Sequence, residues 1–191
     1  SMNRIPEDFH FTRDEKPLPL RPNQEEAIER FKKAIKNKRT HLLMYAVMRF
    51  GKTFTALCCA QQIKDLKLVL VVSAKAGVIT EWQRNVEKCK NFEEFQFVKS
   101  QHLKRNHNLV EEALQNKQKI VVCLTLQDLN NPEIKKHHKQ LFEEDIDLLI
   151  VDETHYGARA EHYGSELRGT ATKRISTEKK YDSENLEDAL E

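Results

Sequence analysis

The sequence lacks the long apolar segments that would assign it to a membrane or to a secretory route. No stretch reaches the roughly 18 consecutive apolar residues that a membrane span requires. Pro6, Glu7, Asp8 and Arg13 fall where the apolar region of a signal peptide would lie. We therefore expect a cytoplasmic protein with no membrane partner.

Cysteine is scarce, and its spacing does not match a metal site. The four cysteines lie in apolar patterns rather than in CxxC pairs. We predict reduced thiols in or near the core of a cytosolic protein. They are Cys58, Cys59, Cys89 and Cys123.

The net charge is also small, at +2 over 191 residues, so a nucleic-acid site would have to be a local patch. A composition of 39% hydrophobic and 32% charged residues indicates one globular domain with a charged surface and excludes general disorder. Ser1-Met2 resembles a scar of tag removal, and we expect the chain to be a piece of a longer protein.

Short apolar runs alternate with helical patterns along the chain. Such alternation predicts an α/β fold of three layers with a mostly parallel sheet, which binds ligands at the carboxyl ends of its strands. The predicted strands are 41–47, 66–73, 95–98, 119–125 and 147–152. The predicted helices are 22–36, 53–66, 78–88, 109–116 and 132–142. We expect an extended arm over 1–20, the folded domain over 21–157 and a charged tail over 158–191.

Residues 46–53 have the spacing of a phosphate-binding loop, with Ala46 followed by four positions and then Gly-Lys-Thr. A loop between a strand and a helix aims backbone N–H groups and the positive end of the helix dipole at one point. There Gly51 allows close approach of a phosphate, Lys52 supplies a mobile charge, and the Thr53 hydroxyl can reach Mg²⁺. The competing interpretation is a chance Gly-Lys-Thr in a turn.

Arg49 and Phe50 are bulkier than the small residues usual in such a loop. They fit if their side chains point away while their amides face the phosphate. Arg49 could also contact phosphate or a neighbouring domain.

The stretch LLIVDETH, residues 148–155, ends a buried strand in two carboxylates followed by a histidine. Asp152 at the strand tip is suited to Mg²⁺, and Glu153 to orienting an attacking water. His155 is a candidate link from the nucleotide site to the next motif. The alternative is an ordinary acidic strand end.

Together, Gly51-Lys52-Thr53 and Asp152-Glu153-Thr154-His155 resemble the motifs of DEAD/DEAH-box helicases and translocases of superfamily 2. The resemblance is closest to the motor subunits of type I and type III restriction enzymes. It implies a RecA-like domain that binds ATP and Mg²⁺. In the same family order, residues 20–31 resemble the segment whose glutamine, here Gln24, reads adenine.

Two further segments resemble the motifs that contact the nucleic-acid backbone. They are 69–82, in which Trp82 is assigned to helix packing, and 121–129. The implied contact residues are Ser73, Lys75, Thr125 and Gln127. Residues 99–108 form a basic stretch that we expect to be a loop, either solvated or touching nucleic acid.

The chain departs from the family at several positions. Thr154 stands where the family usually has alanine. Residues 169–172 look like its coupling motif but end in Lys173 and follow the acidic pair closely. The second RecA-like domain, which carries the arginine finger, is missing from the sequence.

The resemblance implies the first motor domain of a nucleic-acid-dependent ATPase, weakly active alone. The resemblance to restriction motors alone favours DNA over RNA. Two alternatives stay open. One is a non-catalytic nucleotide-binding module that docks a nuclease or restriction subunit, and the other is a different phosphate-loop enzyme such as a kinase.

Overall fold

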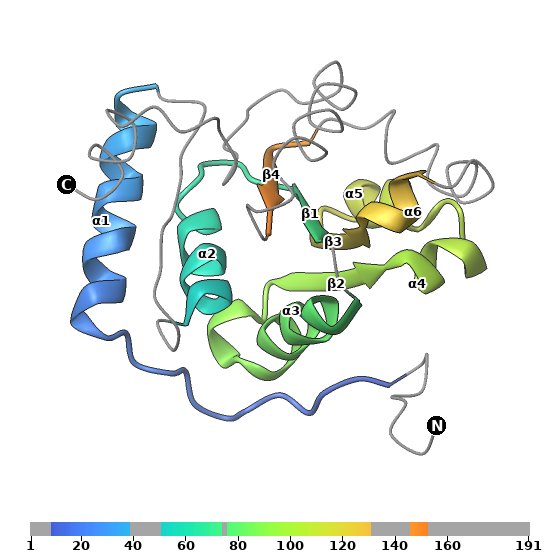
Figure 1. Ribbon diagram of the computed structural model, residues 1–191, viewed down its shortest axis with the longest axis horizontal. Helices are drawn as coiled ribbons and strands as arrows, with labels where there is room; N and C mark the ends of the chain where they lie inside the picture. The colour runs from blue at the N-terminus through green and yellow to red at the C-terminus, as the bar shows by residue number, and fades with distance from the viewer. Residues whose placement is uncertain (1–8, 39–50, 74–75, 131–145, 153–191) are drawn as a thin grey trace.

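A computed structural model describes residues 9–38, 51–73, 76–130 and 146–152 of the chain (Figure 1). Its centre is a four-stranded sheet in the order β2-β3-β1-β4, and every neighbouring pair is parallel. The strands are β1 (Leu68–Ser73), β2 (Phe95–Lys99), β3 (Lys119–Thr125) and β4 (Leu148–Val151). The sequence prediction of a parallel sheet is therefore confirmed.

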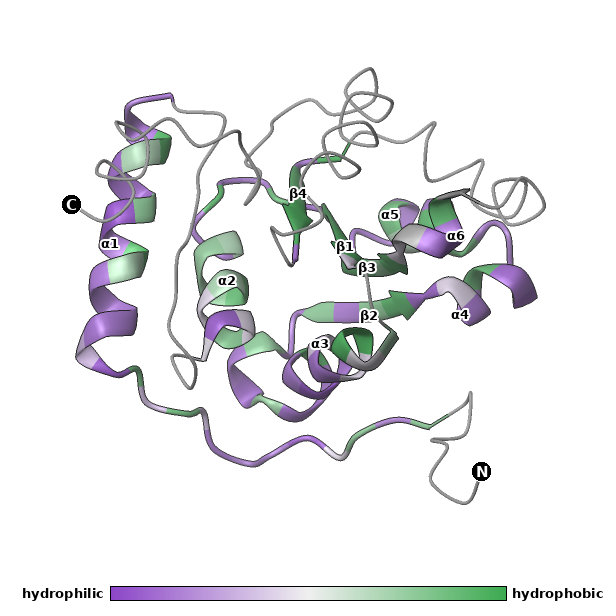
Figure 2. Ribbon diagram, viewed as in Figure 1, coloured by the Kyte–Doolittle hydropathy of each residue, from purple (hydrophilic) through white to green (hydrophobic). Residues whose placement is uncertain are grey.

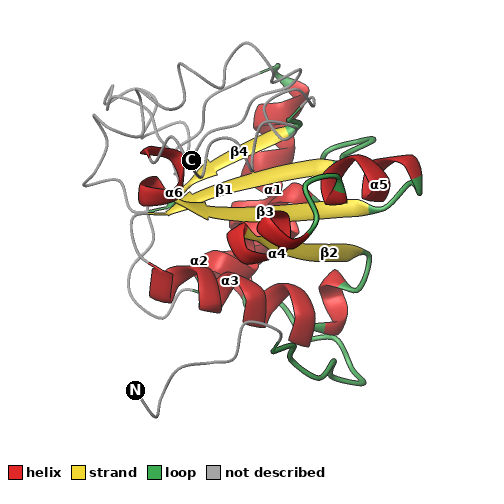
Figure 3. Cartoon of the chain, turned by 90° about the vertical axis from the view of Figure 1, so that its right-hand side faces the viewer, coloured by secondary structure: helices red, strands yellow, loops and turns green. Residues whose placement is uncertain are grey.

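Helices cover both faces of the sheet and make three layers (Figure 3). One face packs against α2 (Lys52–Ala60) and α3 (Ala76–Lys88), and α1 (Pro22–Lys36) lies against α2. The other face packs against α4 (Ser100–Arg105), α5 (Leu109–Gln115) and α6 (Leu126–Asn130). A single 3₁₀ turn, η1 (Lys90–Phe92), follows α3.

The strands are mainly apolar because both faces of the sheet are covered (Figure 2). Their polar residues lie at strand ends and at Gln96 in the edge strand β2. In β1, Val69 and Val71 belong to the core under α2 and α3, whereas Leu70 and Val72 belong to the core under α5 and α6. This alternation follows from the two-residue period of a strand. It also means that Ser73, the next odd position, lies on the α2 and α3 side.

The carboxyl ends of three strands are level with one another. Ser73 is paired with Thr125 across β1 and β3, and Val72 is paired with Val151 across β1 and β4. The backbone N–H of Asp152 donates to the carbonyl of Val72 at 2.9 Å. The edge of the sheet therefore presents side by side Thr125 at the end of β3, Ser73 at the end of β1 and Asp152 directly after β4.

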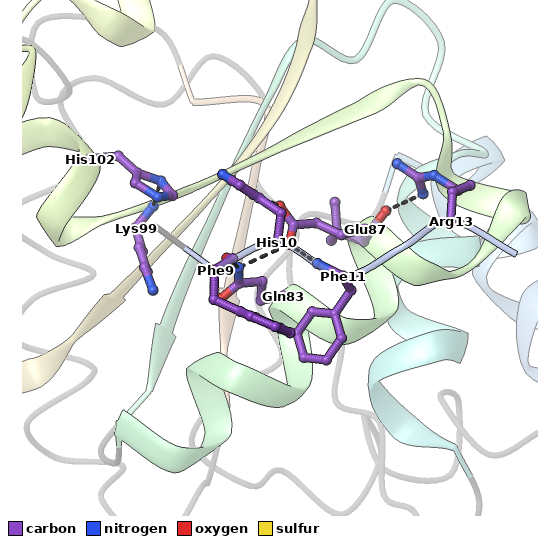
Figure 4. A network of polar contacts seen from close by, with 9 residues as sticks. Phe9, His10, Phe11, Arg13, Gln83, Glu87, Lys99 and His102 are labelled. Atoms are coloured by element: carbon purple, nitrogen blue, oxygen red, sulfur yellow. Dashed lines mark hydrogen bonds and ion pairs between the residues drawn. The ribbon is translucent and has the colours of Figure 1, made fainter. Parts of the chain in front are cut away.

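The segment before α1 runs along α3 without helix or strand (Figure 4). The Arg13 guanidinium donates to the carbonyls of Val86 and Cys89, the latter at 2.8 Å, near the end of α3. His10 bonds the Glu87 carboxylate at 2.6 Å. The described part of the predicted arm is thus extended, and it is fixed to the domain by named contacts.

Several sequence predictions are confirmed in place, and some are wrong. The strands 66–73, 95–98, 119–125 and 147–152 and the helices 22–36, 78–88 and 109–116 appear with ends shifted by at most two residues. The helix predicted over 53–66 is wrong in length, because it ends at Ala60 and turns follow. The loop predicted over 99–108 contains α4. The strand 41–47, the helix 132–142 and the boundary at 157 lie outside the described residues.

Candidate functional site

Gly51 begins α2 in a conformation that favours glycine. Its φ is 75° and its ψ is 48°, the left-handed region that other residues enter at a cost. Its carbonyl accepts the first helical bond from the Thr55 N–H at 2.9 Å and a second from the Thr55 hydroxyl at 2.8 Å. The chain can thereby turn sharply into α2, whose first residue is Lys52.

Gln24, the predicted adenine reader, lies directly against this glycine. Its Nε2 atom is 2.6 Å from the position that a Cβ atom would take on Gly51. Gln24 is buried in the first turn of α1, and its Oε1 accepts the Arg21 N–H at 3.0 Å. The structure therefore brings together two motifs that lie 27 positions apart by their residue numbers.

Lys52 and Asp152 form an ion pair across the site. The Lys52 Nζ and the Asp152 Oδ1 are 2.5 Å apart, although the residues are separated by 100 positions. The aspartate side chain is only 3% exposed, whereas the lysine side chain keeps 45% exposure. Because Asp152 follows β4 and Lys52 opens α2, the pair joins the carboxyl edge of the sheet to a helix N-terminus.

Trp82 on α3 holds the second oxygen of the same carboxylate. Its indole Nε1–H donates to Asp152 Oδ2 at 3.0 Å, and both groups are buried. Trp82 packs in the core as the sequence predicts, at 1% exposure. Its contact with the site was missed. The available signal was chemical, since a buried indole N–H needs an acceptor.

The carboxylate also influences a neighbouring thiol. Burial, together with the charge of Asp152, raises the pKa of Cys123 well above its ordinary value. Cys123 is on β3, on the same face of the sheet as Asp152. The Asp152 carboxylate is therefore enclosed by core residues on one side and paired with the half-exposed Lys52 on the other.

The protein donors in the described residues do not form a complete metal cage. No group of three or more His, Cys, Asp or Glu side chains suited to a metal ion occurs among them. A lone buried carboxylate beside a hydroxyl suits Mg²⁺, which takes one or two carboxylates and fills its shell with phosphate and water. Asp152 is such a buried carboxylate, and Thr53 follows its partner Lys52 in the chain and is half-buried.

The predicted nucleic-acid contacts that are described lie along the same edge. Ser73 is fully buried at the end of β1. Thr125 caps α6, because its hydroxyl accepts the Asp128 N–H while its own N–H donates to the Asp128 carboxylate, both at 3.0 Å. Gln127 is exposed on the first turn of α6. The predicted site residues outside the described part of the chain are Ala46, Arg49, Phe50, Lys75, Glu153 and His155.

The model of the protein family described as "Type III restriction enzyme, res subunit" matches residues 17–183. The chain belongs to this family. The match covers both the Gly-Lys-Thr and the Asp-Glu-Thr-His motifs. The resemblance found in the sequence is therefore confirmed, and the Res-subunit family is one of helicase-like ATPase domains.

Solved structures give the same fold. One is an "ATP-dependent Type ISP restriction-modification enzyme LlaBIII bound to DNA", at 21% identity and a TM-score of 0.56. The aligned region covers 84% of this chain and 12% of that one. Another is the SWI2/SNF2 ATPase core of Sulfolobus solfataricus in complex with dsDNA, at 17% identity and a TM-score of 0.59. It covers 91% of this chain and 34% of that one.

At these identities the structures establish the fold alone, which is a RecA-like α/β domain. The chain spans about an eighth and a third of the two relatives' lengths. None of the curated proteins compared with the chain matches it. In the described part of the chain, no helix is both long and apolar enough to cross a bilayer.

Proposed function

We propose that the chain is the first motor domain of a nucleic-acid-dependent ATPase of the restriction-enzyme type. The observation that carries the proposal is the Lys52–Asp152 pair at the carboxyl edge of the sheet. In parallel α/β sheets that edge is where ligands bind. A lysine at a helix N-terminus beside a buried carboxylate supplies the two charges that a Mg²⁺–triphosphate complex needs.

In this proposal each residue of the phosphate loop has a separate task. Gly51 and the amides after Ala46 would surround the phosphates, and the Lys52 ammonium would leave Asp152 to neutralise them. Lys52 is suited to that exchange because nearly half of its side chain is exposed. Arg49 and Phe50 would contribute backbone amides to the loop.

The metal would be held by Thr53 and Asp152, and the metal would supply charge neutralisation at the transferring phosphate. Glu153 would orient the water, and His155 would connect this site to the next motif. Gln24 would read the adenine ring, which its packing against Gly51 supports. The chain's own contribution is positioning and electrostatics.

Nucleic acid would bind along the adjoining strand ends through Ser73, Lys75, Thr125 and Gln127. The proposal takes duplex DNA as the substrate, with RNA as the less favoured one, because the family is that of restriction-enzyme motors. Efficient hydrolysis would need a second RecA-like domain with an arginine finger, worth about 10³–10⁵ in rate in comparable systems. Nuclease or restriction subunits are the expected further partners, and the cytoplasm is the expected compartment.

Binding of a fluorescent ATP analogue with Mg²⁺ tests the core of the proposal. We expect saturable binding by the chain and at least a tenfold loss of affinity in Lys52→Ala and in Asp152→Ala. Lys90→Ala is the matched control, because Lys90 forms an exposed ion pair with Glu93, away from Asp152. Equal affinity in all four proteins would contradict a nucleotide site here.

Turnover distinguishes the motor from its alternatives. A longer protein that contains this chain and its second domain should hydrolyse ATP faster with duplex DNA, and Glu153→Gln should abolish that activity. Binding without turnover would indicate the docking module. Transfer of phosphate to an acceptor other than water would indicate a kinase.

A further inference from the structure

The two partners of the Asp152 carboxylate differ in their ability to leave it. Lys52 holds Oδ1 from a flexible side chain that is 45% exposed. Trp82 holds Oδ2 from an indole that is 1% exposed and belongs to the main core cluster. A lysine can turn into solvent or toward an anion at little cost, whereas the indole could move only by disrupting close-packed neighbours.

The position of Trp82 follows from the sequence of α3. Ile79, Trp82 and Val86 recur at helical spacing and are all buried against the sheet. Asp152 lies on the same face of the sheet as Ile150, which is in the same cluster. A large aromatic on this helix face therefore meets the tip of β4, and its polar N–H is aimed at the carboxylate.

We infer that Trp82 is a positioning residue for Asp152. It occupies one carboxylate oxygen permanently and leaves the other oxygen for a cation, which is Lys52 in the structure and Mg²⁺ of a nucleoside triphosphate complex in the loaded state. This inference deepens the proposed function and rests on it. The alternative is that the bond only satisfies a buried indole N–H and has no effect on cation binding.

The chain contains one tryptophan, so its indole N–H gives a single side-chain signal in a ¹⁵N-labelled sample. We expect that signal to lie downfield of a free indole and to exchange slowly with solvent. Asp152→Ala should move it toward the free position, whereas Lys52→Ala should leave it nearly unchanged. An indole signal that does not respond to Asp152→Ala would overturn the inference.

The wild-type protein provides the test in the loaded state without any substitution. On addition of ATP with Mg²⁺, the indole signal should stay downfield, because the bond to Oδ2 persists while Lys52 departs. A return to the free-indole position on addition of ATP with Mg²⁺ would show that the bond breaks. That result would overturn the inference even if nucleotide binding is tight.

Trp82→Phe removes the donor and keeps an aromatic ring in the core. Affinity for the fluorescent nucleotide should fall about tenfold with Mg²⁺, the size of one charge-assisted hydrogen bond, and by less than twofold in EDTA. Val86→Ala is the control, since Val86 is buried on the same helix face and its side chain has no polar atom that could bond Asp152. It should lower stability and leave the Mg²⁺ dependence intact.

Nucleotide binding by the chain and the positioning role of Trp82 are contradicted by different results. If the wild-type protein binds no nucleotide with or without Mg²⁺, the proposed function falls, and the cation role of Trp82 falls with it. If the wild type binds Mg²⁺–nucleotide and Trp82→Phe shows the same gain from Mg²⁺, only the positioning role is overturned.

Discussion

The side chain of Gln24 fills the space where any residue but glycine at position 51 would carry its Cβ, 2.6 Å from Nε2. Two constraints therefore act on Gly51. The first is its positive φ of 75°, and the second is this contact with a buried side chain. The first constraint comes from the backbone conformation of Gly51 itself, whereas the second would disappear if the Gln24 side chain were removed.

A double-mutant cycle separates the two constraints. Gly51→Ala should lower the free energy of unfolding by about 1–2 kcal/mol through backbone strain alone, and by a further ~0.5–1 kcal/mol through the contact. In a Gln24→Ala background only the strain should remain. Urea denaturation of the four proteins gives both values. No loss of stability in Gly51→Ala would contradict the left-handed turn.

Arg13 fixes the arm to the end of α3. Its guanidinium donates to two carbonyls of that helix end, Val86 and Cys89, where a cation is also favoured by the helix dipole. Arg13→Ala should reduce the free energy of unfolding by about 1–2 kcal/mol. Lys90→Ala, which removes an exposed ion pair, should change it by less than ~0.5 kcal/mol. Similar values for both variants would show that the Arg13 contacts contribute no more than a surface ion pair.

His102 should make stability depend on pH. Burial lowers its pKa, the Lys99, His10 and Arg105 charges lower it further, and Glu87 opposes them. Its Nδ1 accepts the Lys99 N–H at 3.3 Å, which requires the neutral ring.

Since the folded pKa of His102 lies below the unfolded value near 6.5, the unfolded state takes up the proton first as the pH falls. Stability from this residue should be complete above pH ~6.5 and decline below it. Urea titrations from pH 7.5 downward should show a shallower decline in His102→Gln. A steeper decline in the variant would reverse the sign and refute the assignment.

The four thiols should be nearly inert in the folded chain. Burial raises the pKa of Cys58 and of Cys59 to about 12, and it also raises the pKa of Cys89 and Cys123. Because the thiolate is the reactive form, an aromatic disulfide reagent at pH 8 should label the folded protein slowly. In denaturant all four should react at once. A thiol that reacts in the folded chain at the rate of a free thiol would contradict its burial.

β1, β3 and β4 were predictable because each contains a continuous apolar run that the sheet buries on both faces. LVLVVS and KIVVCLT are short runs rich in valine and leucine, which is typical of strands buried in a parallel sheet. The joining of the Lys52 and Asp152 motifs at one edge was predictable for the same reason, since parallel strands end together. The roles of these residues in binding nucleotide stay predictions.

Other features depended on tertiary contacts that no local pattern reveals. The apolar spacing after Ala60 continues to Leu66, and both Ile63 and Leu66 are buried, yet the chain leaves the helix to reach β1. The basic residues of 99–108 favoured a loop in the sequence. The segment nevertheless forms α4, because Leu103 is buried against the sheet. The bond of Trp82 to Asp152 joins residues 70 positions apart.

The level strand ends have a consequence for how two ligands could influence each other. Ser73 lies between Thr125 and Asp152, one strand spacing of about 4.8 Å from each. A nucleic acid bound at the tip of β1, as proposed, would therefore lie one strand away from the carboxylate that is proposed to hold the metal. Coupling between the two sites would then need only a small lateral shift of the end of β1 against the end of β4. It would not need a chain of contacts through the interior of the domain.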